Sequence, residues 1–267
     1  MKIEKLTEAD TEKVLTKHNQ YATITQRASS TANSSQVTDI KPAIKSPTRV
    51  NVYLNSKYSF SLDISQLADH PLKIGQILTE PELAEYRALS DFGKLYTRAL
   101  EYTLTRPHSE KELRDYLRKK TTPGVVRVKN PQTGLYETKP KKHYPESLIQ
   151  PVLDRLTQKG HLDDAKFATF LVSNYHTKKG ISRRRLEQEL QKKGISSQII
   201  QQTLASTPRS DTTEITKIIT KKRQKYQSDP QKLIQYLVRQ GFDYQEAQTA
   251  VRETDSQNSA QTPPFSP

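Results

Sequence analysis

A twelve-residue pattern occurs three times in this chain without gaps, and it limits the available folds more than any other feature of the sequence. The copies read SEKELRDYLRKK (residues 109–120), SRRRLEQELQKK (182–193) and DPQKLIQYLVRQ (229–240). Each copy begins with Ser or Asp, which favour the N-cap of a helix, and carries Leu at its fifth and ninth positions. Because that spacing puts both leucines on one face of a helix, the pattern predicts three related amphipathic helices.

Each of these helices lies between two other helical segments, so the repeating unit is predicted to contain three helices. The preceding segments are Lys94–Thr105, Asp164–Tyr175 and Thr213–Tyr226. Gly194 and Gly241 follow the second and third copies, at the position where a left-handed residue ends a helix. A last short helix then completes each unit.

Tandem units of this size usually stack, each covering the apolar face of the next. The predicted fold class is therefore mainly α, an elongated tandem repeat of three three-helix units. Repeat 1 is expected at residues 94–160, repeat 2 at 161–207 and repeat 3 at 208–254. Repeat 1 contains 22 extra residues, 121–142, whose alternation in Val125–Lys129 and Leu135–Lys139 predicts an inserted β-hairpin.

The segment before the repeats predicts a small β-structure. RVNVYLNSKYSFSL alternates and is rich in β-branched and aromatic residues, which indicates a hairpin of Arg49–Leu54 and Lys57–Leu62 around Asn55-Ser56. With the following helix, EPELAEYRALSDF, it makes up a predicted N-terminal segment at residues 49–93. MKIEKL, within residues 1–9, is a candidate first strand. Residues 10–48 and 255–267 are polar with little periodicity, which predicts a disordered insertion and a disordered tail.

Positive charge is concentrated in the middle of the chain. The formal net charge is +14, and residues 94–207 alone carry 23 Lys and Arg against 11 Asp and Glu, a net charge of +12. A localised basic surface indicates nucleic acid or another polyanion as a partner. The alternative is that these charges only form a solvated surface.

The candidate binding residues are the basic clusters of the three repeats. They are Lys178, Lys179, Arg183, Arg184, Arg185, Lys192 and Lys193 in repeat 2, Arg118, Lys119, Lys120, Arg127, Lys129, Lys141 and Lys142 in repeat 1, and Lys221, Lys222 and Arg223 in repeat 3. Three arginines directly after the N-cap Ser182 are a poor choice for helix stability, because they face the positive end of the helix dipole. An anionic partner at this helix start would be attracted by both the dipole and the arginines.

The sequence offers no catalytic or cofactor-binding constellation. It has no Cys, its six His are scattered, and it contains neither GxxxxGK[ST] nor GxGxxG. Asp163 and Asp164 stand directly before an apolar run, where an acidic helix cap is expected rather than general acid–base chemistry. No signal peptide is seen, and no apolar run approaches the roughly 18 residues of a membrane helix. We therefore expect a cytoplasmic protein that is not an enzyme, with no metal, no cofactor and no membrane contact.

Several segments together resemble one protein family. They are the hairpin VNVYLNSKYSFSL, the segment RPHSEKEL, the segment GHLDDAKFA and the segment RRRLEQELQKKGI. In this order they resemble RecX, the bacterial regulator of the RecA recombinase, over about residues 49–252. Residues 10–48 and the 22-residue hairpin depart from the family pattern as apparent insertions.

The resemblance implies an elongated helical protein that binds RecA and lies along the groove of its filament on single-stranded DNA. It implies a regulator that inhibits or modulates strand exchange and ATP hydrolysis. The expected partners are the RecA filament and single-stranded DNA, with double-stranded DNA as a further candidate, and the expected state is a monomer. The inserted hairpin is a candidate contact to DNA or to RecA.

Two other functions remain open on the residues alone. The recurring short helices are also compatible with a helix-turn-helix regulator of transcription that binds duplex DNA, although the sequence offers no dimerisation helix. A helical scaffold that binds only protein is the third reading, and it would leave the net charge of +12 in residues 94–207 without a role.

Overall fold

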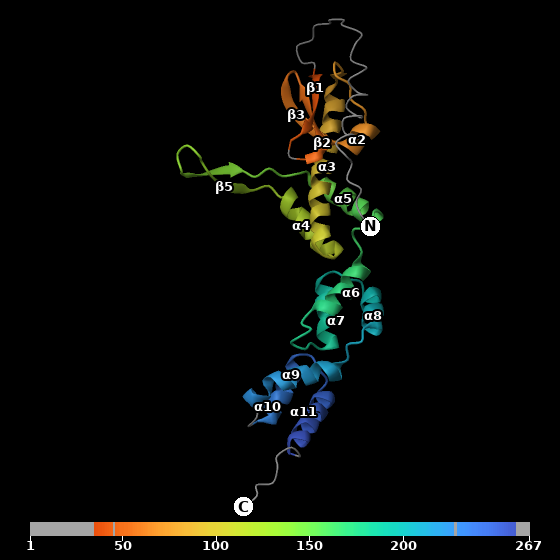
Figure 1. The fold of residues 1–267 in the computed structure, drawn as a ribbon, viewed down its shortest axis with the longest axis vertical. Coiled ribbons are helices and arrows are strands. Elements are labelled where there is room, and N and C mark those ends of the chain that lie inside the picture. The colour runs from red at the N-terminus through yellow and green to blue at the C-terminus, as the bar shows by residue number, and fades with distance from the viewer. Residues whose placement is uncertain (1–34, 45, 227–228, 260–267) are drawn as a thin grey trace, which may run out of the picture. The chain divides into compact units, whose positions relative to one another are not determined.

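The N-terminal segment folds as a four-stranded antiparallel sheet in the computed structural model, which describes residues 35–44, 46–226 and 229–259. The strands are β1 (Ser35–Ala43), β2 (Ser46–Leu54), β3 (Lys57–Asp63) and β4 (Ile77–Leu78). They are arranged in the order β3-β2-β1-β4 (Figure 1). The candidate strand at residues 1–9 lies outside the described residues.

The predicted hairpin is confirmed as β2 and β3. Asn55 and Ser56 form its two-residue turn with φ angles of 47° and 63°. Both angles are positive, as a turn matched to the twist of the flanking strands requires. The backbone N–H of Ser56 also donates to Thr38 Oγ1 at 2.9 Å, which ties the turn to β1.

The prediction of disorder for residues 10–48 is wrong from residue 35 onward, because this part forms β1 and the start of β2. Val37 and Ile40 are both buried although they are three residues apart. A register shift between Val37 and Asp39 brings both side chains to the covered face. Such an irregularity removes the strict alternation by which a strand is recognised in sequence.

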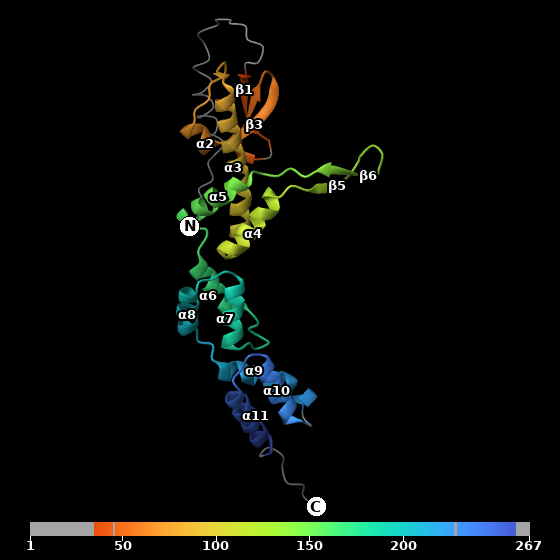
Figure 2. The same ribbon diagram turned by 180° about the vertical axis from the view of Figure 1, so that it is seen from behind.

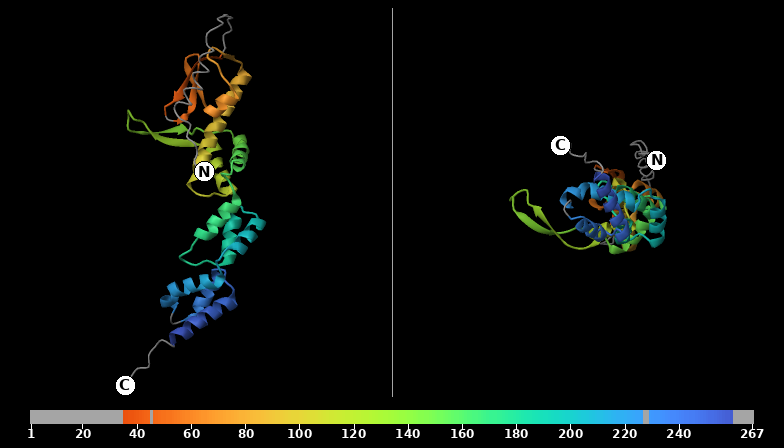
Figure 3. Two further views of the ribbon diagram at one scale, coloured as in Figure 1. Left: turned by 45° about the vertical axis from the view of Figure 1, so that its right-hand side comes forward. Right: turned by 90° about the horizontal axis from the view of Figure 1, so that it is seen from below.

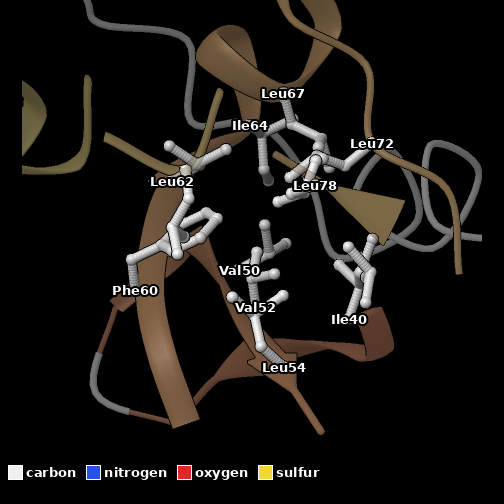
Figure 4. Packing of buried hydrophobic residues seen from close by; sticks show 12 residues of the cluster. Ile40, Val50, Val52, Leu54, Phe60, Leu62, Ile64, Leu67, Leu72 and Leu78 are labelled. Carbon is white, nitrogen blue, oxygen red and sulfur yellow. The ribbon is translucent and has the colours of Figure 1, made fainter. Parts of the chain in front are cut away.

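A hydrophobic core covers one face of the sheet. Figure 4 shows Val50, Val52 and Leu62 of the central hairpin turned toward Leu67 of α2 (Ile64–Asp69), all of them buried. Phe60 stacks on Tyr86 with ring centroids 5.9 Å apart. The core therefore joins the sheet to α2 and to the start of the next helix.

That helix, α3 (Glu80–Thr105), is continuous, and the predicted boundary between residues 93 and 94 falls inside it. A single glycine within a helix costs only about 1 kcal/mol, so Gly93 does not end it. Two compact units are distinguished by their internal contacts. One contains the described residues up to 101 together with 117–152, and the other contains 102–116 together with residues from 153 onward.

The helices of the repeats follow the predicted order (Figures 1 and 2). They are α4 (Glu110–Thr121), α5 (Ile149–Gln158) after a short 3-10 turn, α6 (Asp164–Asn174), α7 (Arg183–Lys192), α8 (Ser197–Ser206), α9 (Asp211–Tyr226), α10 (Pro230–Arg239) and α11 (Tyr244–Ser259). Residues 255–259 of the predicted tail thus belong to α11. Repeats 2 and 3 each enclose a hydrophobic core of their own.

Local helix signals are confirmed at both ends of the middle helices. Ser182 caps α7 by accepting a hydrogen bond from the N–H of Arg185, and Asp229 caps α10 through the N–H of Lys232. Gly194 and Gly241 follow these helices with φ angles of 81° and 91°. These are the left-handed conformations that end a helix.

The insertion in repeat 1 is a two-stranded β-hairpin, within one residue of the predicted bounds. Its strands are β5 (Val125–Lys129) and β6 (Tyr136–Pro140), and they pair in an unbroken antiparallel register. Figure 3 shows it as a narrow ribbon that projects from the helices around it. Among the described residues, no helix is both long and apolar enough to cross a bilayer.

Candidate nucleic-acid interface

The basic clusters of repeats 2 and 3 meet at one cleft. Its volume is about 510 Å³, and Lys179, Arg185, Lys221 and Lys222 line it. Its other lining residues are Tyr175, His176, Gly180, Ile181, Ile218, Tyr236 and Gln240. None of the described residues that line the cleft is acidic, so four cationic side chains share it without a carboxylate.

The loop before α7 forms one wall of the cleft because it packs tightly on α9. Gly180 has a φ of 78°, and a Cβ atom at this position would lie 2.6 Å from the carbonyl oxygen of Glu214. The next residue, Ile181, is buried and donates its backbone N–H to the Glu214 carboxylate at 3.1 Å. Glycine is therefore required here both by conformation and by space.

Behind this wall, Arg209 of repeat 3 ties its repeat to repeat 2, and a buried ion pair within repeat 3 holds Arg209 in place. The Arg209 guanidinium lies 2.8 Å from the Glu214 carboxylate, whose side chain is 2% exposed. Arg209 also donates to the carbonyl oxygens of Val172 and Tyr175 at 2.7 and 2.8 Å. Burial opposes ionisation of Glu214, but hydrogen bonds from Arg209 and Lys217 outweigh it and hold its pKa below the ordinary value.

The start of α7 lies against the end of α10. This contact accounts in part for the arginines in the first turn of α7. The Ser182 hydroxyl donates to the carbonyl oxygen of Gln240, the C-cap residue of α10, at 2.8 Å. The Arg185 guanidinium donates to the Gln240 side chain. Because the C-terminal end of a helix carries partial negative charge, α10 offsets the repulsion between the arginines and the positive end of α7.

Two aspartates join successive repeats in the same way. The N–H of Arg183, the first residue of α7, donates to Asp211 Oδ1 at 2.7 Å, and Asp211 is the first residue of α9. In the preceding repeat, the N–H of Glu110 donates to Asp164 Oδ1 at 2.9 Å. Burial raises the pKa of both aspartates. Each carboxylate therefore caps the middle helix of the preceding repeat.

The adjacent acids Asp163 and Asp164 are thus two caps for two helices. Asp163 accepts from the N–H groups of Ala165 and Lys166, at the start of its own helix α6. Asp164 caps α4 instead. The predicted role in helix capping is confirmed for Asp163, and the second role could not be seen in the sequence because its partner lies 54 residues away.

Lys192 and Lys193 lie away from the cleft, in contact with repeat 1. Lys193 forms an ion pair of 2.6 Å with Glu112, which also lies 3.0 Å from Arg106. Burial opposes ionisation of Glu112, but these two cations prevail and lower its pKa from 4.5 to about 2. The ammonium of Lys192 lies 2.8 Å from Glu189. Both lysines therefore have partners within the protein.

The remaining basic candidates are placed separately. Lys178 is exposed, and its carbonyl oxygen accepts from the ammonium of Lys221. Arg183 and Arg184 are exposed on α7, and Arg223 is half-buried on α9 outside the cleft lining. The candidates in repeat 1 lie on α4 or on the inserted hairpin and do not line the cleft: Arg118, Lys119, Lys120, Arg127, Lys129, Lys141 and Lys142.

The candidate residues from the sequence include no tyrosine, but two tyrosines belong to the cleft. Tyr175 and Tyr236 line the cleft, and the Lys222 ammonium lies 5.8 Å from the Tyr236 ring centroid. Both tyrosines also pack against the hydrophobic cores of their repeats, so each ring joins a core to the cleft. No cluster of His, Asp or Glu suited to a metal ion occurs among the described residues.

Comparisons with known proteins decide the family. Residues 35–79 match the model of the regulatory protein RecX N-terminal domain, and residues 163–204 match that of the RecX second three-helix domain. The regulatory protein RecX of Bacillus licheniformis is 31% identical over 228 residues, which cover 83% of this chain and 78% of the relative. This chain belongs to the RecX family. The RecX proteins are regulatory proteins and not a family of enzymes.

Other RecX proteins agree with this assignment. The Bacillus subtilis protein is 28% identical over 232 residues, covering 85% of this chain and 80% of the relative. A crystal structure of a regulatory protein RecX, 24% identical, matches 81% of this chain and 98% of its own with a TM-score of 0.61, which shows the same fold. Since the RecX N-terminal model begins at residue 35, residues 35–48 belong to the family domain and are not an insertion.

Proposed function

We propose that this protein regulates RecA by binding the RecA filament on single-stranded DNA, and that the cleft between repeats 2 and 3 contacts the DNA backbone. Membership of the RecX family supports the first part. The observation that supports the second is the meeting of Lys179, Arg185, Lys221 and Lys222 in a cleft whose described lining includes no acid.

The electrostatics of the cleft favour an extended polyanion. Four like charges around one cleft repel one another, and a phosphate backbone relieves that repulsion while it releases counterions. Tyr175 and Tyr236 add aromatic rings beside the cations, a combination that suits single-stranded nucleic acid. The hydrogen bonds from Arg209 to Val172 and Tyr175 hold the two repeats together before the partner arrives.

Inhibition or modulation of the recombinase then follows from occupancy of the filament. A regulator bound to filament DNA and to RecA restrains the changes that accompany ATP turnover and strand exchange. This role requires only binding, and it requires no catalytic group among the described residues.

The test is the ATPase activity of RecA on single-stranded DNA while this protein is titrated at substoichiometric ratios. We expect the rate of ATP turnover to fall already at ratios well below one copy of this protein per RecA. A variant with Lys179, Lys221 and Lys222 changed to Ala should lose most of this effect. Lys232→Ala is the matched control, because Lys232 is exposed on α10 and forms an ion pair with Asp229 away from the cleft lining.

No change in turnover, even with RecA from the same organism, would contradict the proposal. In that case a sequence-specific interaction with duplex DNA becomes the function to test.

A further inference from the structure

The inserted hairpin presents two chemically different faces. Directly opposed residues of an antiparallel pair lie on the same face. Arg127 and Lys129 of β5 pair with Thr138 and Tyr136 of β6, so these four residues share one face. The opposite face carries Val126 and Val128 with their partners Lys139 and Glu137.

The only acidic side chain of the hairpin is already bound within it. Glu137 accepts from the side-chain amide of Asn130 and lies 3.4 Å from the Lys139 ammonium. By contrast, Arg127 and Lys129 form no ion pair or side-chain hydrogen bond within the described part of the chain, and both are exposed. The face of Arg127, Lys129, Thr138 and Tyr136, here called the arginine face, therefore has uncompensated positive charge.

An aromatic ring stands beside these cations. Tyr136 is 67% exposed and lies directly opposite Lys129. Arg127 is its diagonal neighbour, within reach of a long side chain. Exposed tyrosine next to unpaired cations is the combination by which proteins bind single-stranded nucleic acid, with bases stacked on the ring and phosphates on the cations.

The hairpin is shaped in advance but covers no core. At its tip, the Asn130 carboxamide oxygen accepts from the N–H of Gln132 at 2.9 Å, which fixes the turn. At its base, the Lys141 ammonium donates to the carbonyl oxygens of Lys119 and Thr122. A two-stranded ribbon alone in water is only marginally stable, so a ligand on the arginine face also stabilises the ribbon.

We propose that the arginine face of the inserted hairpin is a second, RecA-independent binding site for single-stranded DNA. Tyr136 stacks on a base, while Arg127 and Lys129 contact the backbone phosphates on either side. The site is separate from the cleft between repeats 2 and 3, and it does not depend on the proposed regulation of RecA.

The test measures binding of the full chain to a fluorescein-labelled oligothymidylate without RecA, by fluorescence anisotropy at several salt concentrations. We expect Tyr136→Ala to weaken binding about tenfold and Tyr136→Phe to leave it within about twofold, because Phe retains the stacking ring. Arg127→Ala should reduce the slope of log K against log salt by about 0.7.

Lys139→Ala is the matched control, because it removes one positive charge from the hairpin, as Arg127→Ala does, but on the opposite face. It should leave affinity within about twofold, since its charge is partly offset by Glu137. All substituted side chains are exposed, and unchanged circular dichroism and thermal unfolding confirm the fold of each variant. Deletion of residues 122–142 should cost at least as much affinity as Tyr136→Ala.

Three results would overturn the proposal. The first is an equal loss of affinity for Lys139→Ala and Arg127→Ala, which would show that binding depends on the total charge of the hairpin and not on its arginine face. The second is equal or tighter binding of a duplex of the same length that responds to the same variants. The third is unchanged oligothymidylate binding by the Tyr136 and Arg127 variants together with lost RecA inhibition, which would make this face a protein contact.

Discussion

Arg183, Arg184 and Arg185 begin α7 although arginine disfavours the first turn of a helix. The structure divides their roles. Arg185 reaches the C-terminal end of α10 and lines the cleft, whereas Arg183 and Arg184 are exposed without an ion pair among the described residues. Ser182 connects α7 to α10, because its hydroxyl both caps α7 and donates to the carbonyl oxygen of Gln240.

Ser182→Ala should therefore lower the free energy of unfolding by about 2 kcal/mol, of which about 1 is the helix cap and about 1 the hydrogen bond to repeat 3. Ser196→Ala is the control, because Ser196 caps α8 through the N–H of Ile199 alone. It should cost about 1 kcal/mol. Urea denaturation measures both, and equal costs would show that the contact between Ser182 and Gln240 is not stabilising.

Glu112 makes stability depend on acid pH. Its pKa falls from 4.5 to about 2 in the folded protein, so its ionised form stabilises the fold above about pH 4.5. This contribution, about 2 kcal/mol after allowance for solvent screening, is lost as the pH falls toward 2. The difference in unfolding free energy between the wild type and Glu112→Gln should shrink over that window. A difference that stays constant with pH would contradict the assigned pKa.

At the scale of the elements, each repeat is joined to the next by a hydrogen bond that occurs at corresponding positions in the two pairs of repeats. Asp164 caps α4 and Asp211 caps α7, and each is the first residue of the first helix of the following repeat. The first helix of each following repeat thus completes the hydrogen bonding of the preceding middle helix. The loop at Gly180 adds a tighter contact between repeats 2 and 3.

Gly180→Ala tests whether that loop shapes the cleft. We expect a loss of about 3 kcal/mol in unfolding free energy, about 1 from the positive φ and the rest from the clash with Glu214. Gly160→Ala is the control, because Gly160 has a φ of 73° but no atom within 4 Å of an added Cβ. It should cost about 1 kcal/mol. Similar losses for both variants would mean that the loop yields without strain.

At the scale of the whole molecule, the features that can be predicted from the sequence are those that depend on residues close together in the chain. Helix caps at Ser182 and Asp229, the turn at Asn55-Ser56 and the inserted hairpin depend on short-range signals, and all are confirmed. The elongated arrangement of the three repeats stays a prediction. Four of the basic candidates meet in the cleft, because repeats 2 and 3 place their clusters at a shared boundary.

The missed features depend on residues far apart in the chain. β1 escapes recognition because a register shift hides its alternation, and only pairing with β2 and β4 reveals it. Arg209 gives no sign in sequence of its contacts with Val172 and Tyr175, more than 30 residues earlier. Lys193 likewise gives no sign in sequence of its ion pair with Glu112, 81 residues earlier.

The most direct test of the central claim is the salt dependence of binding to a RecA filament on single-stranded DNA. The wild type is compared with the variant in which Lys179, Lys221 and Lys222 are changed to Ala. If the cleft contacts the DNA backbone, the slope of log K against log salt should fall by about 2, or about 0.7 for each lost cation. An unchanged slope, with the variant still folded, would contradict the assignment of the cleft as the DNA contact.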